Sequence, residues 1–257
     1  MKTNQSIAVL LHVYYVDMLD EIFLYLRNLN HNFDLYVNLT IENGSVVNME
    51  KIREEYPQAI ITISPNKGVD VGGFLYSFKQ LKKDYDLILK IHTKKSIGTA
   101  TRPSDMVKVY GREVGEQKGR EWFINMMNGV LGDEEKVDKI LNEFNENSEC
   151  GMIGTYHDNY VGRNGQHLKE LCDIFDLDFE LYFTPEGGRL KDVTFVGGTF
   201  FWIRHNILKK YFTEKNVNLA LELMPEGYFN EPSHNHAFER IFGLVNNKEE
   251  KKLIEIK

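Results

Sequence analysis

An α/β fold built on a mostly parallel sheet is the architecture that this sequence predicts. In the first 96 residues, short β-branched apolar runs alternate with amphipathic runs. The apolar runs have the length of buried strands, and the amphipathic runs have the spacing of helices. Strands that alternate with helices pair in parallel, through right-handed crossovers. We therefore expect a Rossmann-like sheet flanked by helices.

The first half of the chain supplies four expected strands and three expected helices. The strands are expected at residues 7–13, 33–39, 59–63 and 85–91, and the helices at residues 17–29, 46–56 and 73–83. Pro57 ends the second helix, because its ring cannot continue a helix. The third and fourth strands are short and apolar, so we expect both to be buried.

The second half of the chain is expected to mix helices, strands and loops. Helices are expected at residues 105–128, 133–146, 166–174 and 233–245, and strands at residues 151–155 and 193–203. Asp133 is a good N-cap for the second of these helices. The charged tail at residues 248–252 is expected to be solvated and frayed. No low-complexity linker divides the chain, so we expect one domain, 1–257, with an α/β half (1–96) and a mixed half (97–257).

Composition and charge narrow the class of protein. Hydrophobic residues make up 42% and charged residues 27% of the 257, as in soluble globular proteins. The net charge of −7 argues against nucleic-acid binding, since no positive field covers the chain. Two cysteines without metal-like spacing are expected to be reduced thiols in the cytoplasm. We see neither a signal-peptide pattern nor an apolar run that could span a bilayer, so any membrane contact is expected to be peripheral.

A glycine-rich loop follows the third expected strand. Its notable residues are Asn66, Lys67, Gly68, Asp70, Gly72 and Gly73. Glycines let backbone N–H groups approach a ligand closely, and two of them at a helix start weaken the helix unless such an approach is needed. The alternative is a plain turn, because Asn, Gly and Asp are turn formers. The GxGxxG fingerprint is absent, which disfavours a dinucleotide cofactor.

A cationic cluster follows the fourth expected strand. It consists of His92, Thr93, Lys94 and Lys95. Ligands of open α/β sheets bind at the carboxyl ends of the strands, so we expect this cluster and the glycine loop to line one crevice. Lysines can neutralise phosphate oxygens without a metal. The pattern thus predicts a site for a phosphorylated ligand, and a solvated basic loop is the alternative.

Two patterns elsewhere are weighed as further parts of a site. Gly197 and Gly198 interrupt an apolar run, and glycines in a strand often mark the close approach of a ligand. Asp176 and Asp178 form an Asp-x-Asp, a pattern that can hold Mg²⁺ or Mn²⁺. We favour the simpler interpretation of this acidic pair, which is a helix terminus followed by a loop.

Acidic and imidazole groups gather at the start of the last expected helix. His236 and Glu239 are three residues apart and share a helix face, with Glu231 shortly before them. A glutamate beside a histidine can act as a general base. One such pair offers too few ligands for a metal site. A capped, salt-bridged helix start is the alternative.

Taken in order, these segments resemble the rhamnan synthesis protein F family of glycosyltransferase-like domains. The matching segments are residues 8–15, 33–37, 66–70, 85–96, 122, 131–132, 151–154, 198–204 and 236–240, which together cover nearly the whole chain. The run at 85–96 is the most specific match. The resemblance implies a GT-A-like fold and work in bacterial cell-surface polysaccharide assembly. Many GT-A enzymes carry a metal-binding Asp-x-Asp where this chain has His92-Thr93-Lys94, and this departure counts against Mg²⁺ or Mn²⁺ dependence.

The resemblance implies transfer of a hexose, with rhamnose suggested by the family name, from a nucleotide-diphospho-sugar to a glycan or lipid-linked glycan. Residues 1–96 would then bind the nucleotide, and residues 97–257 the acceptor. The loop at 66–73 would hold the nucleotide or sugar, residues 92–95 the diphosphate, and Gly197 and Gly198 the acceptor, with Arg204 as a further binding candidate. Glu239, or else Glu231, would deprotonate the acceptor hydroxyl, with His236 beside it.

The expected place of action is the cytoplasm, at the inner face of the membrane if the acceptor is lipid-linked. Two other hypotheses remain open. One is a glycan- or nucleotide-sugar-binding module without catalysis, which the missing acidic pair supports. The other is a different phosphate-handling α/β enzyme, against which the absence of Walker and GxGxxG motifs speaks.

Overall fold

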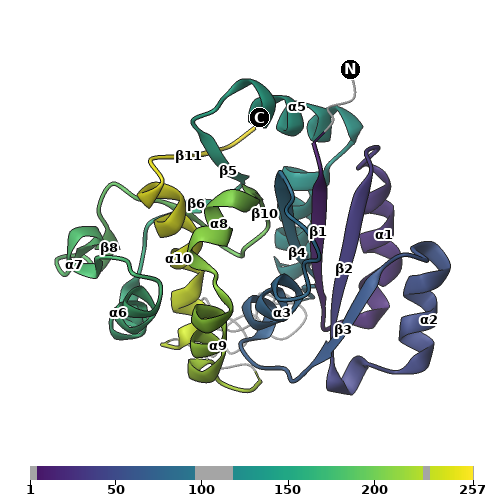
Figure 1. The fold of residues 1–257 in the computed structure, drawn as a ribbon, viewed down its shortest axis with the longest axis horizontal. Coiled ribbons are helices and arrows are strands. Elements are labelled where there is room, and N and C mark those ends of the chain that lie inside the picture. The colour runs from purple at the N-terminus through teal and green to yellow at the C-terminus, as the bar shows by residue number, and fades with distance from the viewer. Residues whose placement is uncertain (1–4, 96–117, 228–231, 257) are drawn as a thin grey trace.

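A seven-stranded sheet forms the centre of the protein (Figure 1). The computed structural model describes residues 5–95, 118–227 and 232–256. The sheet contains β1 (Ile7–Val13), β2 (Phe33–Thr40), β3 (Ile60–Ser64), β4 (Leu87–His92), β5 (Cys150–Gly154), β10 (Phe201–Arg204) and β11 (Lys252–Ile254). Their order is β11-β5-β10-β4-β1-β2-β3. β1 to β4 run parallel, whereas β10 is antiparallel to β4 and β5, so the fold is the mostly parallel, Rossmann-like α/β architecture that the sequence predicts.

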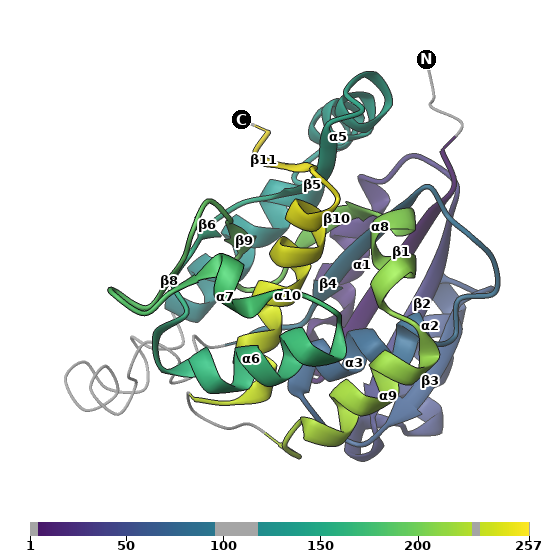
Figure 2. The same cartoon turned by 60° about the vertical axis from the view of Figure 1, so that its left-hand side comes forward.

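Helices cover both faces of this sheet. They are α1 (Leu19–Arg27), α2 (Val46–Glu55), α3 (Val69–Phe78), α5 (Glu134–Glu146), α6 (Gly165–Ile174), α7 (Phe179–Tyr182), α8 (His205–Tyr211), α9 (Glu214–Leu223) and α10 (His234–Lys248), and residues 118–131 are also helical. Figure 2 shows α3, α6, α9 and α10 gathered on one side of the sheet, with α1 on the other. Each side has its own apolar core. The face with α3 and α10 is the one that carries the candidate site.

Short elements connect the larger ones. β6 (His157–Asp158) pairs with β9 (Phe195–Val196), and β7 (Phe183–Thr184) pairs with β8 (Arg189–Leu190). Single 3₁₀ turns are η1 (Val16–Met18), η2 (Ile41–Asn43) and η4 (Gly162–Asn164). The run at residues 193–203, expected as one strand, is therefore split: β9 joins the small β6 ladder, and β10 joins the main sheet.

Several elements lie where the sequence predicts them, and others do not. β1 has the expected bounds, and Asp133 caps α5 by accepting a hydrogen bond of 2.7 Å from the backbone N of Lys136. β3 was expected to be buried, but it is the outer strand of the sheet and leaves Ile63 45% exposed. The tail is not frayed, since β11 pairs in parallel with β5. Sequence reasoning missed α8 and α9 altogether.

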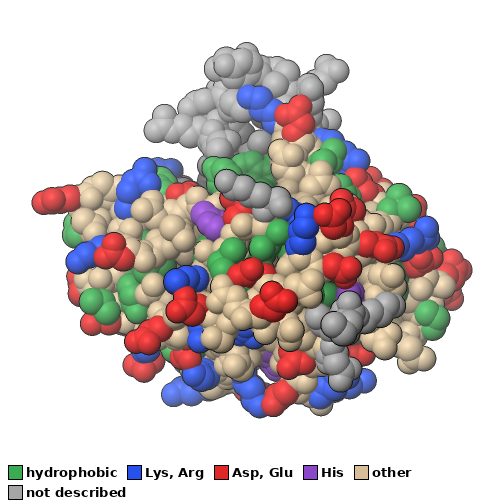
Figure 3. Space-filling model, turned by 90° about the horizontal axis from the view of Figure 1, so that it is seen from above, with side chains coloured by type: hydrophobic (Ala, Val, Ile, Leu, Met, Phe, Trp, Pro, Cys, Tyr) green, Lys and Arg blue, Asp and Glu red, His purple; other side chains and the backbone are tan. Residues whose placement is uncertain are grey.

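The cysteines, the surface charges and the helices can be compared with what the composition predicts. Both cysteines are buried free thiols. Figure 3, which looks down on the side where β1 begins, shows acidic and basic side chains intermingled over the described part of that face. Within residues 5–95, 118–227 and 232–256, no helix combines the length and apolar character that a membrane crossing requires.

The glycine pair of the 66–73 loop serves packing inside the protein. α3 begins at Val69, so Gly72 and Gly73 are buried in its interior and do not open the helix. A Cβ on Gly72 would lie 1.6 Å from the carbonyl oxygen of Lys67, and one on Gly73 would lie 2.0 Å from Nδ1 of His12. The carbonyl oxygen of Lys67 occupies the space beside Gly72, so a ligand cannot approach there. This corrects the expectation that Gly72 admits a ligand.

A buried polar network lies beneath α3 and explains the need for Gly73. His12, Asn38 and Ser64 stand near the carboxyl ends of β1, β2 and β3. Nδ1 of His12 is 2.8 Å from Oδ1 of Asn38, whose Nδ2 donates to Oγ of Ser64 at 2.9 Å. Burial lowers the pKa of His12, so the neutral imidazole carries its proton on Nδ1 and donates it to Asn38. The three strand ends are therefore joined by hydrogen bonds directly under the helix that holds Asp70.

Replacing Gly73 with alanine tests whether this packing holds α3 in place. A methyl group there overlaps the His12 ring, and overpacking of this kind costs about 1–3 kcal/mol in the free energy of unfolding. Gly165→Ala is the matched control, because its nearest neighbour would be 3.5 Å away and alanine favours a helix. Urea unfolding of both variants gives the comparison. A Gly73→Ala variant as stable as Gly165→Ala would show that the glycine is not required for packing.

Candidate functional site

Three side chains from separate segments form a closed triangle at the carboxyl edge of the sheet. Nζ of Lys90, on β4, lies 2.7 Å from Oδ2 of Asp70 in the first turn of α3. The same ammonium donates to Oγ1 of Thr199 at 2.6 Å, and this hydroxyl donates to Oδ2 of Asp70, also at 2.6 Å. Each member of the triangle thus contacts the other two, which fixes the orientation of the Asp70 carboxylate.

Local structure explains why these side chains meet. Side chains on a strand alternate between faces, so Lys90 and His92 project from β4 to the side where α3 and α10 pack. Asp70 lies at the positive end of the α3 dipole, which favours a carboxylate. Thr199 adopts a φ of 60°, directly after Gly198 with a φ of 77°. A threonine with positive φ is strained, and its contacts with Lys90 and Asp70 help to hold it there.

The triangle contains a buried ion pair that is open at one end. Lys90 is 1% exposed, whereas the Asp70 side chain is 22% exposed. Burial alone would raise the pKa of Asp70, but the Lys90 ammonium, His92 and hydrogen bonds from Lys90 and Thr199 hold that pKa well below its usual value. Burial lowers the pKa of Lys90 more than Asp70 raises it. Asp70 is therefore the member of the pair that a ligand can reach, and it is charged when the ligand arrives.

His92 lies beside the ion pair and is neutral. Its Nε2 is 2.9 Å from the carbonyl oxygen of Gly198 and 3.7 Å from Oδ2 of Asp70. Burial lowers the pKa of His92 to about 4; the charge of Asp70 opposes this shift, and Lys90 and Lys94 add to it. The neutral ring donates from Nε2 to Gly198 and so holds the loop that precedes β10. His92 therefore supplies a hydrogen bond, which corrects the expectation of a cationic histidine facing a diphosphate.

The other residues of the predicted cationic cluster have different surroundings. Oγ1 of Thr93 accepts hydrogen bonds of 3.0 Å from the backbone N of both Tyr14 and Tyr15, so this hydroxyl ties β4 to the chain after β1. The Lys95 ammonium pairs with Asp17 in η1. Lys94 is half-buried, and its charge acts on Lys90, His92 and Glu239. Of this cluster, Lys94 is the residue with a charge directed at the site.

The start of the glycine loop is bound to the chain after α9. The backbone N of Gly68 donates to Pro225 at 2.8 Å, and the carbonyl oxygen of Asn66 accepts from Gly227 at 2.6 Å. Nζ of Lys67 donates to the carbonyl oxygen of Glu222 at 3.3 Å. These hydrogen bonds hold residues 66–68 against the chain after α9, just before the first turn of α3. Asp70 is the loop residue that the structure brings into the site.

Glu239 reaches the same site from α10. Its side chain is 21% exposed, and Oε2 lies 3.6 Å from the Arg240 guanidinium. Burial raises the pKa of Glu239 to about 7; Asp70 adds to this shift, while Arg240, Lys94 and Lys90 oppose it. A carboxyl group with this pKa exchanges a proton readily near neutrality. It is thus suited to act as a general base or acid.

The other predicted site residues do not all lie in this site. His236 is buried, with Nδ1 2.7 Å from Oγ of Ser233 at the helix start, while Glu231 lies outside the described residues. Gly197 and Gly198 belong to the loop that carries Thr199. Arg204 is not part of this site.

Arg204 lies at the opposite edge of the sheet because β10 is antiparallel to β4. It pairs with Leu87, at the beginning of β4. Its guanidinium donates to backbone carbonyl oxygens of Phe144, Asn147 and Cys150 and lies over the ring of Phe144. Arg204 therefore caps the end of α5 and stabilises the fold, which corrects its assignment as a binding residue.

Sequence reasoning missed two residues of the triangle. Lys90 is the one charged residue within β4 other than the ionisable His92, and a lysine in a doubly covered strand needs a partner. That signal was available and pointed to a buried ion pair. Thr199 gave no signal of its own beyond its place after two glycines.

The residues of this site do not fit a divalent cation. Oδ2 of Asp70 already accepts hydrogen bonds from Lys90 and Thr199, and the Lys90 and Lys94 ammonium groups would repel a dication. The acidic pair elsewhere ends a helical region, as favoured from the sequence: Asp178 caps α7, and Asp176 lies 3.7 Å from Lys248. Among the described residues, no three His, Cys, Asp or Glu side chains could jointly hold a metal.

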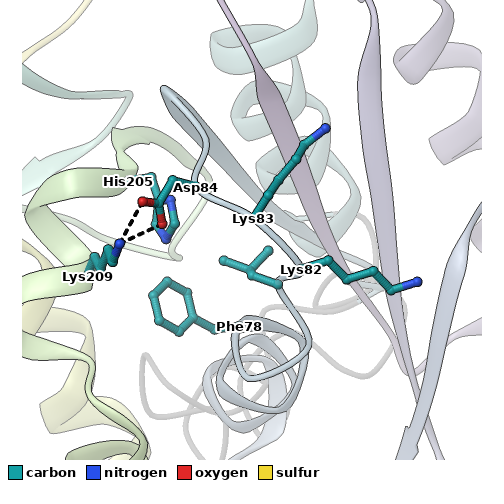
Figure 4. Close-up of a pocket in the computed structure, with 7 residues that line it drawn as sticks. Phe78, Lys82, Lys83, Asp84, His205 and Lys209 are labelled. Atoms are coloured by element: carbon teal, nitrogen blue, oxygen red, sulfur yellow. Dashed lines mark hydrogen bonds and ion pairs between the residues drawn. The ribbon is translucent and has the colours of Figure 1, made fainter.

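A separate pocket lies at the amino edge of the sheet (Figure 4). It is lined by Phe78, Leu81, Lys82, Lys83, Asp84, His205 and Lys209. Lys209 is paired with Asp84, and Figure 4 shows Lys82 and Lys83 pointing away from the cavity. Its charges therefore do not converge on a ligand as those of the carboxyl-edge site do.

Fold and site together define a Rossmann-like α/β protein with an ion pair and a titratable glutamate at the carboxyl edge of its sheet. The chain belongs to the rhamnan synthesis protein F family, whose family model matches residues 1–251. It is also similar to two proteins described as uncharacterized protein WxcX, from the ATCC 33913 and B100 strains of Xanthomonas campestris pv. campestris. Each is 26% identical over 249 residues, which is 94% of this chain and 31% of the relative. The chain thus spans about a third of these relatives, and its family indicates a role in polysaccharide synthesis.

A double-mutant cycle on Lys90 and Asp70 tests the buried ion pair. Lys90→Met leaves the Asp70 charge without its partner, and breaking a buried pair in this way costs about 3–5 kcal/mol. Adding Asp70→Asn should recover part of that loss, because it removes the unpaired charge. Urea unfolding measures the stability of Lys90→Met, of Asp70→Asn and of the double variant. Lys209→Met, which breaks the exposed pair with Asp84, is the control and should change the stability little. A Lys90→Met variant that is no less stable than this control would contradict the ion pair.

Proposed function

We propose that this protein is a glycosyltransferase that moves a hexose, with rhamnose as the first candidate, from a nucleotide-diphospho-sugar to a cell-surface glycan or lipid-linked glycan. One observation carries the proposal: two carboxyl groups at one sheet edge have pKa values pushed in opposite directions. The pKa of Asp70 is held well below its usual value, whereas that of Glu239 is raised to about 7. Such a divergence assigns one carboxylate to binding and the other to proton transfer.

The chemistry follows from these two groups. Glu239 takes the proton of the acceptor hydroxyl while the oxygen of that hydroxyl bonds to the anomeric carbon of the donor sugar. The bond from that carbon to the diphosphate oxygen breaks, and the diphosphate leaves with the electron pair. Lys94 offsets the negative charge that develops on the leaving group. One base suffices for a displacement that inverts the configuration at the anomeric carbon. Asp70 accepts hydrogen bonds from the hydroxyl groups of the donor sugar.

No metal has a role in this scheme, since the residues at the end of β4 repel a dication. We propose that the reaction takes place in the cytoplasm, at the inner face of the membrane where the acceptor is lipid-linked. Family membership and the position of the site at the carboxyl edge of the sheet support a sugar-nucleotide ligand. Donor binding without turnover would instead identify a binding module of the assembly system.

Replacing Lys94 tests the diphosphate contact. Lys94→Ala should weaken binding of a nucleoside diphosphate by about 1.5–3 kcal/mol, the range for losing a hydrogen bond to a charged group. Lys95→Ala is the matched control, because its ammonium pairs with Asp17 and does not face the site. Calorimetry in the presence of EDTA gives both affinities. Equal Kd values for the two variants would exclude Lys94 as the diphosphate ligand.

Replacing Glu239 tests the general base. Glu239→Gln should lower kcat by about 10²–10⁴-fold, while the donor Kd and the Tm stay close to wild type. In the wild type, kcat/KM should rise with pH through about 7, because the base acts only after it has lost its proton. Glu249→Gln, at the far end of α10, is the control. Full activity of Glu239→Gln over a panel of nucleotide-sugars would remove Glu239 from the reaction.

A further inference from the structure

An aromatic pair stands beside the loop that carries Thr199. The rings of Trp122 and Tyr156 have centroids 4.8 Å apart, with an angle of 52° between their planes. Tyr156 is 52% exposed, whereas Trp122 is partly buried behind it. A large aromatic side chain that remains half exposed next to a polar site offers a flat apolar face to a ligand.

Both rings pack directly on the glycine pair. A Cβ on Gly197 would lie 2.6 Å from Cδ1 of Tyr156, and one on Gly198 would lie 2.9 Å from Nε1 of Trp122. The carbonyl oxygen of Gly198 in turn accepts the hydrogen bond from His92. The glycines expected to admit a ligand thus admit these two rings, and they place the rings next to the Asp70 site.

The backbone around the pair is strained. Tyr156 has a φ of 58°, and across the β6–β9 ladder Gly198 and Thr199 have φ values of 77° and 60°. The backbone N of Gly197 donates to the carbonyl oxygen of Tyr156 at 3.0 Å, which joins the two strained turns. A tyrosine with a left-handed backbone is strained, so its surroundings must hold it there. The turn that imposes this strain is the one that directs the ring outward.

Hydrogen bonding does not account for the position of Trp122. Its Nε1 is buried and has no hydrogen-bond partner within the described part of the chain. The indole is therefore held by packing, and its large face supports the Tyr156 ring. Exchanging it for phenylalanine would remove an unsatisfied donor, a change that proteins tolerate.

We propose that Tyr156, backed by Trp122, is the platform on which a sugar ring of the acceptor glycan lies while its hydroxyl faces Glu239. This inference rests on the proposed function and adds the acceptor subsite to it. A pyranose ring has a face of C–H groups and an edge of hydroxyl groups. The negative face of an aromatic ring attracts the C–H face, and the hydroxyl edge is left for polar partners.

The position of the platform favours the acceptor over the nucleobase of the donor, which could also stack on a tyrosine. The platform adjoins the loop that leads into β10, on one side of β4. The strands β1, β2 and β3, with the loop to α3, lie on the other side of β4. Donor and acceptor therefore have separate places on either side of the Lys90–Asp70 pair.

Calorimetry on the full chain tests the subsite with two probes, a rhamnose trisaccharide and dTDP. Tyr156→Ala should raise the trisaccharide Kd by about tenfold, and Tyr156→Phe by less than about twofold, since phenylalanine keeps the ring face. The Kd for dTDP should not change. Tyr160→Ala, which removes an exposed tyrosine that lies against Arg189, is the matched control, and Trp122→Phe should fold and keep the platform.

The two proposals fail in different ways. A trisaccharide Kd within about twofold of wild type in Tyr156→Ala, or a wild type that does not bind the trisaccharide, overturns the subsite. A Tyr156→Ala variant that loses dTDP affinity instead also overturns it, because the ring would then hold the nucleobase. Platform-dependent binding of the trisaccharide, without binding of dTDP or of any nucleotide-sugar in the panel, supports the subsite but rejects the glycosyltransferase.

Discussion

The buried contact between Lys90 and Asp70 is the interaction on which the rest of this site depends. A lysine with 1% exposure on a central strand requires a partner, and α3 supplies it from its first turn. For Asp70 to reach Lys90, α3 must lie close to the strands, and this closeness leaves no room for a side chain at Gly73. The missing side chain at Gly73 and the contacts of the strained Thr199 therefore both serve this ion pair.

The ion pair also sets the proton chemistry of its neighbours. The ammonium of Lys90 keeps Asp70 charged. Burial raises the pKa of Glu239, and the charge of Asp70 adds to this shift. The same surroundings keep His92 neutral, so this ring can donate to Gly198 at physiological pH. Ion pairing at Asp70 and burial at Glu239 thus separate the roles of two carboxyl groups that come from helices far apart in the sequence. This separation is what a site needs if it is to bind the hydroxyl groups of a donor sugar and also remove a proton.

Local sequence patterns predicted the layout of the protein better than its contacts. The alternation of apolar and amphipathic runs identified the parallel sheet, and the ends of β3 and β4 pointed to the edge where Lys90 and Asp70 meet. What failed depends on partners distant in the sequence. Arg204 caps α5 and β3 is an outer strand, and neither can be read without the strand order. Lys90 could have been recognised, because a charge inside a buried strand implies a partner even when the partner is unknown.

The loop at residues 197–199 joins the two halves of the chain at the site. Gly197 and Gly198 give room to the Tyr156 and Trp122 rings, while Thr199 contacts the ion pair. A change in the position of this loop would move the hydroxyl that orients Asp70 and the proposed sugar platform together. The hydrogen bond from His92 to the carbonyl oxygen of Gly198 ties this loop to the end of β4. The strained backbone at Thr199 and Tyr156 holds the apolar Tyr156 ring close to the buried Lys90–Asp70 pair. A relaxed backbone would let the ring and the ion pair move apart.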